Sequence, residues 1–158
     1  MRELTRDPSG DLSVLARAFL GKSGGNQLFY FPTADPKETP ATWGVRYDDV
    51  WFKSKDGTNL HGWFLFSKKK PALGTVVFSH GNAGAIGHHL GFVTWLLPEG
   101  FNVFLYDYRG FGSSGGSIQR HGLIEDVWAA FDYVKSRPDV DRTRLISMGH
   151  SLGGAKSI

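Results

Sequence analysis

The chain of 158 residues contains no cysteine. This absence excludes disulfide bonds, thiolate catalysis and cysteine-ligated metal sites, and it is compatible with any redox compartment. An excess of charge of one sign is also missing, because the formal net charge is only +3. The lysines are scattered apart from residues 68–70, which we expect to form a solvated loop between strands. The sequence therefore offers no basic patch for a nucleic-acid partner.

Long hydrophobic runs are missing as well. Residues 12–20 are mostly apolar but include Arg17, and a membrane-spanning helix needs roughly 20 apolar residues. We expect instead a short amphipathic helix that packs on the domain rather than on a membrane surface. Its apolar side chains share one helical face: Leu12, Leu15, Ala16 and Phe19. With no signal peptide or transmembrane segment in the sequence, a cytoplasmic location is favoured.

The composition indicates a globular protein with a substantial core. Hydrophobic residues make up 41% of the chain and aromatic residues 14%. These proportions exclude a disordered protein, and the length favours one domain. No internal repeat is visible. We divide the chain into residues 1–40, a short helix and extended lead-in, and residues 41–158, the α/β part.

The α/β part begins with a predicted hairpin. Residues 45–53 and 60–66 are strand-like, and Asp56-Gly57 between them is typical of a hairpin turn. From residue 75 onward, apolar strands alternate with segments of helical length. We expect strands at 75–79, 102–106 and 144–148 and helices at 86–97 and 122–136. This alternation predicts an α/β fold with a mostly parallel sheet.

The predicted helix at 122–136 has a broad apolar face, which we expect to lie in the core. That face consists of Ile124, Val127, Trp128, Phe131 and Val134. Three acidic residues lie elsewhere on the helix: Glu125, Asp126 and Asp132.

The most informative motif is Gly-His-Ser-Leu-Gly at 149–153, directly after the strand at 144–148. A strand that turns sharply into a helix can hold a serine hydroxyl exposed at the turn, which is the geometry of a nucleophile elbow. The residues two before and two after the serine must be small, and Gly149 and Gly153 meet this requirement. The pattern predicts that Ser151 is a nucleophile.

A second copy of the same pattern lies at 112–116, with Ser114 at its centre. More polar residues follow it, rather than a helix, and an Asp-Tyr-Arg turn precedes it. We therefore interpret Ser114 as part of a flexible loop.

Acyl transfer through a serine also needs donors for the oxyanion that develops on the carbonyl. Leu152 is predicted to open the next helix, so its backbone N–H is one candidate donor. The turn after the strand at 75–79 contains His80, Gly81 and Asn82. We expect the second donor to be the backbone N–H of Asn82, with Gly81 allowing close approach of the substrate. An ordinary strand-to-helix connection is the alternative for this turn.

These motifs, taken together, resemble the α/β-hydrolase superfamily, most closely its Bem46-like branch of serine aminopeptidase-like hydrolases. The resemblance is carried by Phe-Tyr-Phe-Pro at 29–32 with Asp-Gly-Thr-Asn-Leu-His-Gly-Trp at 56–63, His-Gly-Asn-Ala-Gly at 80–84, Tyr-Asp-Tyr-Arg-Gly-Phe-Gly-Ser-Ser-Gly at 106–115, and Gly-His-Ser-Leu-Gly-Gly at 149–154. The resemblance implies an α/β-hydrolase fold with an N-terminal antiparallel hairpin.

The resemblance also implies a role for each matching residue. Ser151 would be the nucleophile, Asn82 and Leu152 would form the oxyanion hole, and residues 107–115 would form a structural loop beside the site. His80, Gly81, Gly149 and Gly153 would support these turns. The substrate would be a small ester, thioester or amide, and the acyl-enzyme reaction would need neither cofactor nor metal.

One part of the family pattern is missing. In this family the catalytic acid and histidine follow the nucleophile in the chain, yet residues 152–158 contain no aspartate, glutamate or histidine. The later strands of the sheet are absent too, which would leave an exposed strand edge. We therefore expect an incomplete fold, truncated after the nucleophile, with little or no turnover. The alternative is a truncated product with no enzymatic role.

The other histidines are not expected to replace the missing base. The side chain of His150, adjacent to Ser151, should diverge from it and pack. No carboxylate that could orient the remaining ones is evident from the sequence: His61, His80, His88, His89 and His121.

A minor alternative is dinucleotide binding, because Gly-Phe-Gly-Ser-Ser-Gly at 110–115 fits the glycine pattern of such sites. However, residues 107–109 separate these glycines from the preceding strand, and Lys135 lies where that motif expects an acidic residue.

Overall fold

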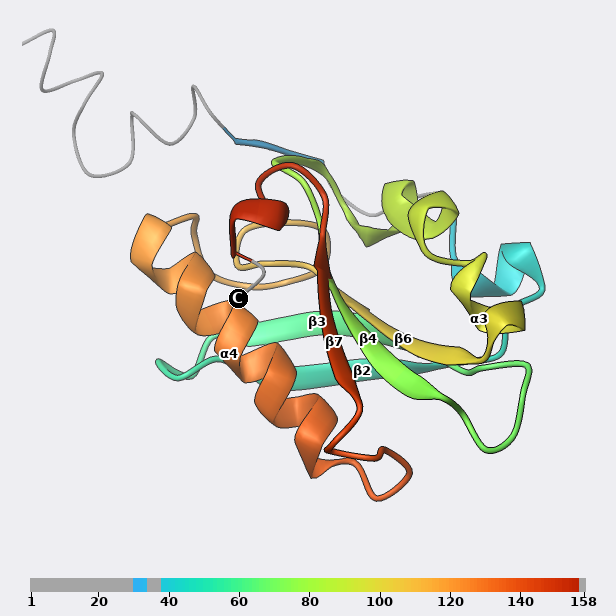
Figure 1. The fold of residues 1–158 in the computed structure, drawn as a ribbon. Coiled ribbons are helices and arrows are strands. Elements are labelled where there is room, and N and C mark those ends of the chain that lie inside the picture. Colours follow the sequence, from blue (N-terminus) through green and yellow to red (C-terminus); the bar gives the residue numbers. More distant parts are fainter. Residues whose placement is uncertain (1–29, 34–37, 157–158) are drawn as a thin grey trace, which may run out of the picture.

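The computed structural model describes residues 30–33 and 38–156. The helix expected at residues 12–20 lies outside this part of the chain. The main sheet has five strands in the order β2-β3-β6-β4-β7 (Figure 1). Strands β2 (Tyr47–Lys53) and β3 (Asn59–Leu65) form the predicted antiparallel hairpin, with Tyr47 opposite Leu65.

The other three strands are parallel to one another. They are β4 (Gly74–Ser79), β6 (Phe101–Tyr106) and β7 (Leu145–Gly149). Strand β4 lies between β6 and β7, and β6 pairs antiparallel with β3. The sequence therefore predicted the α/β class correctly, and each expected strand lies within two residues of its observed position. Strands β2 and β7 form the two edges of the sheet.

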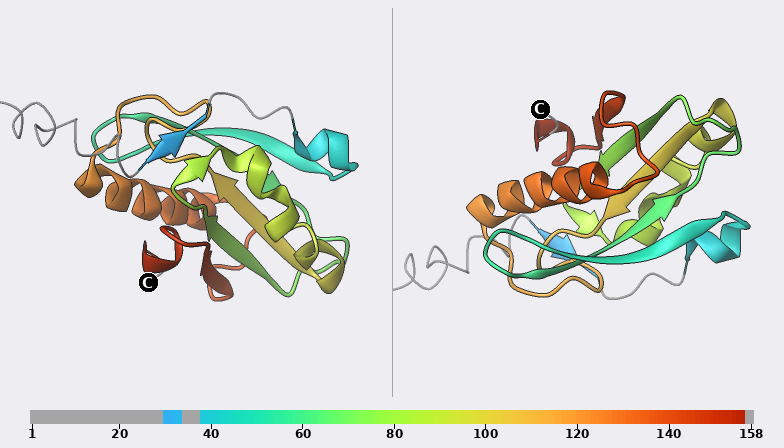
Figure 2. Two further views of the ribbon diagram at one scale, coloured as in Figure 1. Left: turned by 90° about the horizontal axis from the view of Figure 1, so that it is seen from above. Right: turned by 90° about the horizontal axis from the view of Figure 1, so that it is seen from below.

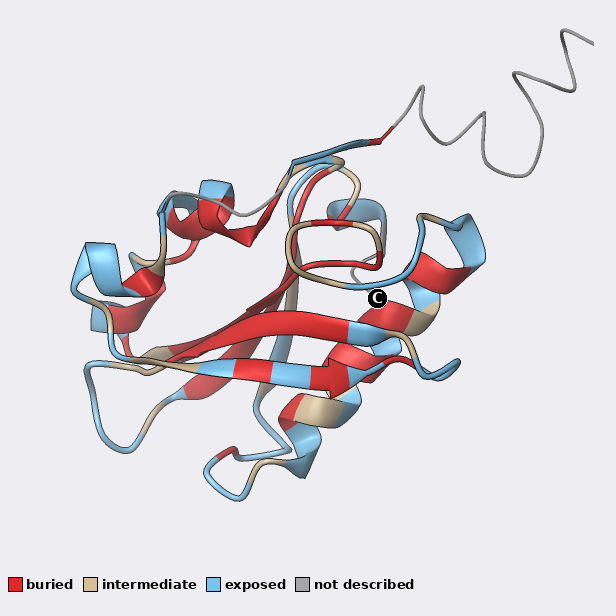
Figure 3. Cartoon of the chain, turned by 180° about the vertical axis from the view of Figure 1, so that it is seen from behind, coloured by how far each residue is buried: buried red, intermediate tan, exposed pale blue. Residues whose placement is uncertain are grey.

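Helical segments cover both faces of the sheet (Figures 1 and 2). Helix α4 (Arg120–Ser136) packs on one face, where alternate strand residues such as Val77 and Phe104 point. The segment after β4 packs on the other face, against residues such as Phe78 and Leu105. Figure 3 shows the consequence: β3 is buried along almost its whole length, whereas edge strand β2 alternates between buried and exposed residues.

The segment after β4 is not the single α-helix expected at 86–97. It consists of a 3-10 helix, η2 (Ile86–Phe92), and a short α-helix, α3 (Leu96–Glu99). Gly87 and Gly91 lie within it, and each glycine disfavours an α-helix by about 1 kcal/mol relative to alanine. The backbone N–H of Ile86 is bonded to the buried carboxylate of Asp107 at 2.9 Å. The glycines thus weaken a regular α-helix, and the bond to Asp107 fixes the start of the more tightly wound 3-10 turn.

The buried face of α4 also differs from the predicted one. Trp128 is 53% exposed and Ile124 is 44% exposed, whereas Asp126 is fully buried. The sheet side of the helix is formed largely by small residues and by Asp126: Gly122, Leu123, Asp126, Val127, Ala129, Ala130 and Val134. Pairing with a distant arginine places Asp126 inside, and this rotates Trp128 away from the core.

That arginine is Arg109, in the loop after β6. Its Nη2 donates to Asp126 Oδ1 at 2.8 Å and to Ser54 Oγ at 3.0 Å, while its Nη1 donates to Asp56 Oδ2 at 2.7 Å. The hydrogen bonds to Asp126 are the main reason that the pKa of Arg109 is raised. A Cβ on Gly122 would collide with this guanidinium. One buried cation thus joins the loop, α4 and the hairpin turn.

A second polar contact, which is partly buried, joins β2 and β3. His61 Nε2 lies 2.7 Å from Asp49 Oδ1, and His61 Nδ1 lies 3.9 Å from Asp107 Oδ2. No carboxylate partner for His61 was evident from the sequence, and the structure corrects this with Asp49 and Asp107. Burial disfavours the imidazolium, but the carboxylates of Asp107 and Asp49 outweigh it, so the pKa of His61 is raised.

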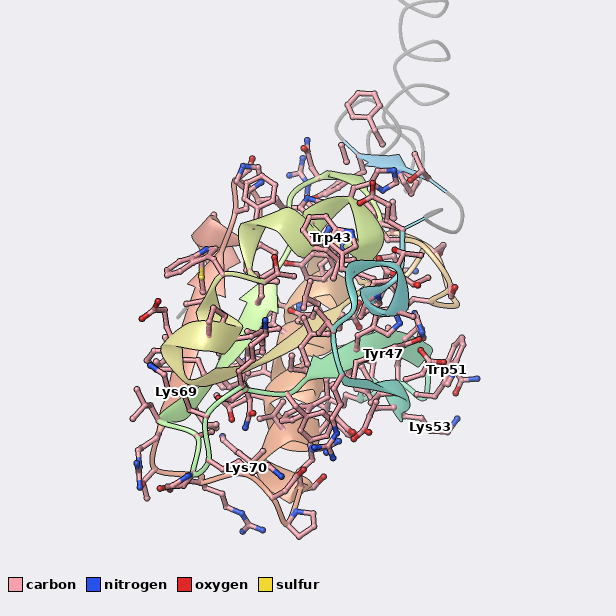
Figure 4. The ribbon with its side chains drawn as sticks, turned by 90° about the vertical axis from the view of Figure 1, so that its right-hand side faces the viewer. Trp43, Tyr47, Trp51, Lys53, Lys69 and Lys70 are labelled. Atoms are coloured by element: carbon pink, nitrogen blue, oxygen red, sulfur yellow. The ribbon has the colours of Figure 1, made fainter. Side chains whose placement is uncertain are left out.

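Polar and aromatic side chains are exposed on the outer side of β2 and on the loop before β4 (Figure 4). Trp51 is 57% exposed, and its ring centroid lies 4.9 Å from that of His61. Residues 68–70 are exposed, as the sequence predicted. Within residues 30–33 and 38–156, none of the helices has the length and apolarity needed to cross a bilayer.

We expect Asp126→Asn to lower the free energy of unfolding by about 3 kcal/mol, because the buried guanidinium of Arg109 loses its charged partner. Asp132→Asn, at an exposed position on the same helix, is the matched control and should change it by less than about 0.5 kcal/mol. Urea unfolding at neutral pH measures both. Equal effects of the two variants would contradict a structural role for this ion pair.

We also expect the contribution of Asp49 to stability to depend on pH. A raised pKa of His61 in the folded state stabilises the protein below the unfolded value of about 6.5, and this stabilisation is lost as the pH rises through the folded value. Asp49→Asn should therefore destabilise more at about pH 6 than at about pH 9. Unfolding curves at both pH values test this, and a difference that does not vary with pH would refute it.

Candidate active site

The site lies where β4 and β7 end side by side. Ser79 pairs with Gly149 at the last position of the two strands, and the backbone N–H of His150 donates to the Ser79 carbonyl at 3.1 Å. Beyond this point the segments that follow β4 and β7 separate. After β4 it leads to η2 on one face, whereas Leu152, after β7, packs against the core on the α4 face. Such a divergence opens a crevice at the carboxyl ends of parallel strands, where ligands bind in open α/β sheets.

Ser151 lies at this divergence in an unusual backbone conformation. It is exposed, and its φ of 52° makes it the only non-glycine residue with positive φ in the described part of the chain. The left-handed region costs a non-glycine residue of the order of 1 kcal/mol or more, and such residues cluster at functional sites. The backbone therefore turns sharply at Ser151.

The segment after Ser151 differs from the expected helix start at Leu152. A turn is followed by a short 3-10 helix, η3 (Gly154–Lys156). The backbone N–H of Ala155 does donate to the Ser151 carbonyl, at 3.3 Å.

Gly153 has a clear steric reason to be glycine. It is buried, and a Cβ at this position would collide with the backbone carbonyl of Ser79. Its backbone N–H donates to the His150 carbonyl at 2.9 Å. The close approach of the turn to β4 therefore depends on the absence of a side chain at residue 153.

The turn after β4 lies directly against Ser151. A Cβ built on Gly81 would lie 3.1 Å from His150 Nδ1 and 3.7 Å from Ser151 Cβ. His80 is fully buried, with its Nδ1 2.7 Å from the Gly81 carbonyl oxygen and its ring packed against Tyr108. His80 thus supports the turn from inside the protein, and Gly81 keeps the space beside Ser151 open.

Asn82 is held in place by residues 30–33, the first residues that the structure describes. The backbone N–H of Phe31 donates to the Asn82 carbonyl at 2.8 Å. The strand pair β1 (Phe31–Pro32) and β5 (Ala83–Gly84) continues this contact in parallel register. Residues 31 and 32, which belong to the stretch that carries part of the family resemblance, therefore support the turn containing Asn82.

A cavity of about 300 Å³ brings the predicted residues together. It is lined by Tyr30, Asn82, Arg120, Ser151 and Leu152. Three of these were predicted from the sequence. Tyr30 and Arg120 were not given a role, because no local motif indicates that the chain brings them to Ser151. No histidine is among the described residues that line the cavity.

The other sequence candidates have different surroundings. Ser114 donates its hydroxyl to the Asp107 carbonyl at 2.7 Å and accepts the backbone N–H of His61 at 2.9 Å, which fits a structural loop. His150 is exposed, and its ring stacks near Phe92 with centroids 4.6 Å apart. Across residues 30–33 and 38–156, no group of three His, Asp or Glu side chains converges as metal ligands would.

We expect Gly153→Ala to destabilise the protein by about 3 kcal/mol, because its methyl group meets backbone atoms of β4 that cannot move independently. Gly154→Ala is the matched control. Its Cβ would lie 3.5 Å from the nearest atom, the Gly149 carbonyl oxygen, so the change should be within about 0.5 kcal/mol. Thermal unfolding compares the two variants, and a tolerated alanine at 153 would disprove the tight turn.

Comparisons with known proteins identify relatives of this chain. Residues 70–158 match a family described as "Serine aminopeptidase, S33". The protein YfhR of Salmonella typhimurium is 44% identical over 132 residues, covering 80% of this chain and 43% of that protein. Protein bem46 of Schizosaccharomyces pombe is 28% identical over 155 residues, covering 93% of this chain and 51% of that protein.

Among solved structures, the esterase Pf2001 of Pyrococcus furiosus is similar with a TM-score of 0.69 and 27% identity, over 82% of this chain and 49% of that one. The chain thus spans about half the length of the curated relatives it matches. The mixed sheet and its helices are those of a partial α/β-hydrolase fold. The chain belongs to the α/β-hydrolase superfamily, in its Bem46-like, serine aminopeptidase-like branch.

Proposed function

We propose that Ser151 is the nucleophile of a serine hydrolase that cleaves esters, thioesters or amides through an acyl-enzyme. The observation that carries the proposal is the strained backbone of Ser151, at a φ of 52°, facing a cavity that Asn82 and Leu152 also line. A serine held in this way presents its hydroxyl to a bound carbonyl, and the sharp turn needs glycine at residue 153.

Two backbone N–H groups would stabilise the oxyanion, from Leu152 and from Asn82. Leu152 follows the nucleophile directly, and the turn containing Asn82 approaches it through Gly81. Donors that are fixed before the reaction cost no reorganisation when charge develops on the carbonyl oxygen. The hydrogen bond between Phe31 and Asn82 and the burial of His80 supply this rigidity.

The described lining of the cavity contains no general base that could accept the proton of Ser151. A serine needs a general base, which a histidine provides in the Ser-His-Asp arrangement. None of the five described side chains around the cavity is a histidine or a carboxylate. We therefore expect the 158-residue chain by itself to acylate slowly, thousands of times below an enzyme with a full triad.

Dinucleotide binding, the minor alternative, has less support. The glycines at 110–115 are held by backbone hydrogen bonds. The N–H of Gly110 donates to the Gly115 carbonyl at 2.9 Å within the loop, and that of Gly115 donates to the carbonyl of Asn59, the first residue of β3, at 2.9 Å. A Cβ on Gly112 would collide with the Asp107 carboxylate. These glycines are explained by the packing of the loop.

Covalent labelling tests the assignment of the nucleophile. Prolonged incubation of the 158-residue chain with a fluorophosphonate should give a slowly formed adduct, which peptide mass spectrometry should locate on Ser151. Ser151→Ala should abolish the adduct. Ser114→Ala, in the other Gly-x-Ser-x-Gly sequence, should not reduce it.

Two results would contradict the proposal in different ways. An adduct at another residue, or no adduct at all, would remove Ser151 as the nucleophile. Fast labelling with multiple turnovers on a chromogenic ester would retain Ser151 but disprove the inference that the chain lacks a base.

A further inference from the structure

We propose that the Ser151 cavity accepts an acyl substrate that carries a negatively charged group, and that Arg120 binds this group. The proposal deepens the proposed function and rests on it, because it assigns to one molecule both the charged group and the carbonyl that faces Ser151.

Arg120 is the only charged side chain among the described residues that line the cavity. The other four are neutral: Tyr30, Asn82, Ser151 and Leu152. Arg120 is the first residue of α4 and is exposed. A single cation at a cavity with no acidic residue in its lining favours an anionic ligand over a neutral or cationic one.

Arg120 also has no carboxylate partner in the described part of the chain, because none of the ion pairs there includes it. Three other arginines are paired: Arg109 with Asp126, Arg137 with Asp48 and Arg144 with Asp141.

The helix explains this difference. Residues three and four positions along a helix are the natural partners of a charged side chain, and for Arg120 these are Leu123 and Ile124. The acidic residue of this region, Glu125, instead lies 3.5 Å from His121 Nε2. The guanidinium of Arg120 is thus available to a ligand.

The guanidinium binds carboxylate and phosphate groups in the same way, through paired N–H donors. The cavity volume of about 300 Å³ lies at the small end of ligand sites. Arg120 and Ser151 line the same small cavity, so one short molecule reaches both. The substrates that fit are hemiesters of short dicarboxylic acids and small esters that carry a phosphate group.

A binding experiment on the full 158-residue chain tests this independently of acylation. Monomethyl glutarate provides a carboxylate and an ester, dimethyl glutarate is its neutral counterpart, and 3-phosphonooxypropyl acetate provides a phosphate. Titrations followed by ¹H–¹⁵N NMR give the three dissociation constants and show which amides shift. We expect the two anionic esters to bind about five-fold more tightly than the neutral diester at low salt, and residues 82, 120 and 152 to shift.

The variants identify the group responsible. Arg120→Gln should weaken binding of the anionic esters to the level of the diester and leave the diester unchanged, whereas Arg120→Lys should retain part of the preference. Arg142→Gln, at another exposed arginine in the loop between α4 and β7, is the matched control and should change nothing.

Equal affinity for the monoester and the diester, a preference that survives Arg120→Gln, or no detectable binding of either would overturn the proposal. The ranking of the carboxylate and phosphate esters decides which anion the cavity prefers. Binding needs no acyl transfer. The affinities can therefore be interpreted even if the labelling test does not identify Ser151 as the nucleophile.

Discussion

The hydrogen bond from His150 N–H to the Ser79 carbonyl is the contact on which the site depends. It extends the pairing of β4 with β7 by one residue beyond the last strand position. Ser151 consequently follows a backbone that is still fixed to the sheet, and Gly81, the second residue after β4, lies opposite it. The relative position of the serine and the turn that carries Asn82 is therefore set by sheet geometry, which varies less than loop geometry.

Below these turns lies a layer of buried polar groups that fixes them to the rest of the fold. The carboxylate of Asp107 accepts the backbone N–H of Ile86, which ends the turn containing Asn82, and lies near His61 and His80. Arg109, two residues later, binds Asp126 on the helix that begins with Arg120. The loop after β6 thus positions both the turn containing Asn82 and the helix that borders the cavity, although none of its residues lines that cavity.

The parts that the sequence predicted well are those set by local pattern. Continuous apolar runs predicted the buried parallel strands, and the Asp56-Gly57 turn predicted the hairpin. The predictions failed where a distant partner decides the outcome. Arg109 draws Asp126 into the core and so turns Trp128 outward, and Asp107 binds the start of the segment that was expected to be one helix. Tyr30 and Arg120 reach the cavity only because segments far apart in the sequence meet there.

The conformation of Ser151 shows what this part of the chain contributes by itself. A positive φ at a serine costs about 1 kcal/mol or more. This is a sizeable share of a typical folding stability of about 5–15 kcal/mol. The strain persists because the sheet holds residue 150 on one side and Gly153 packs against Ser79 on the other. Both restraints come from residues of β4 and of the turn after β7, namely Ser79, His150 and Gly153. The exposed position of Ser151 is therefore determined by the fold.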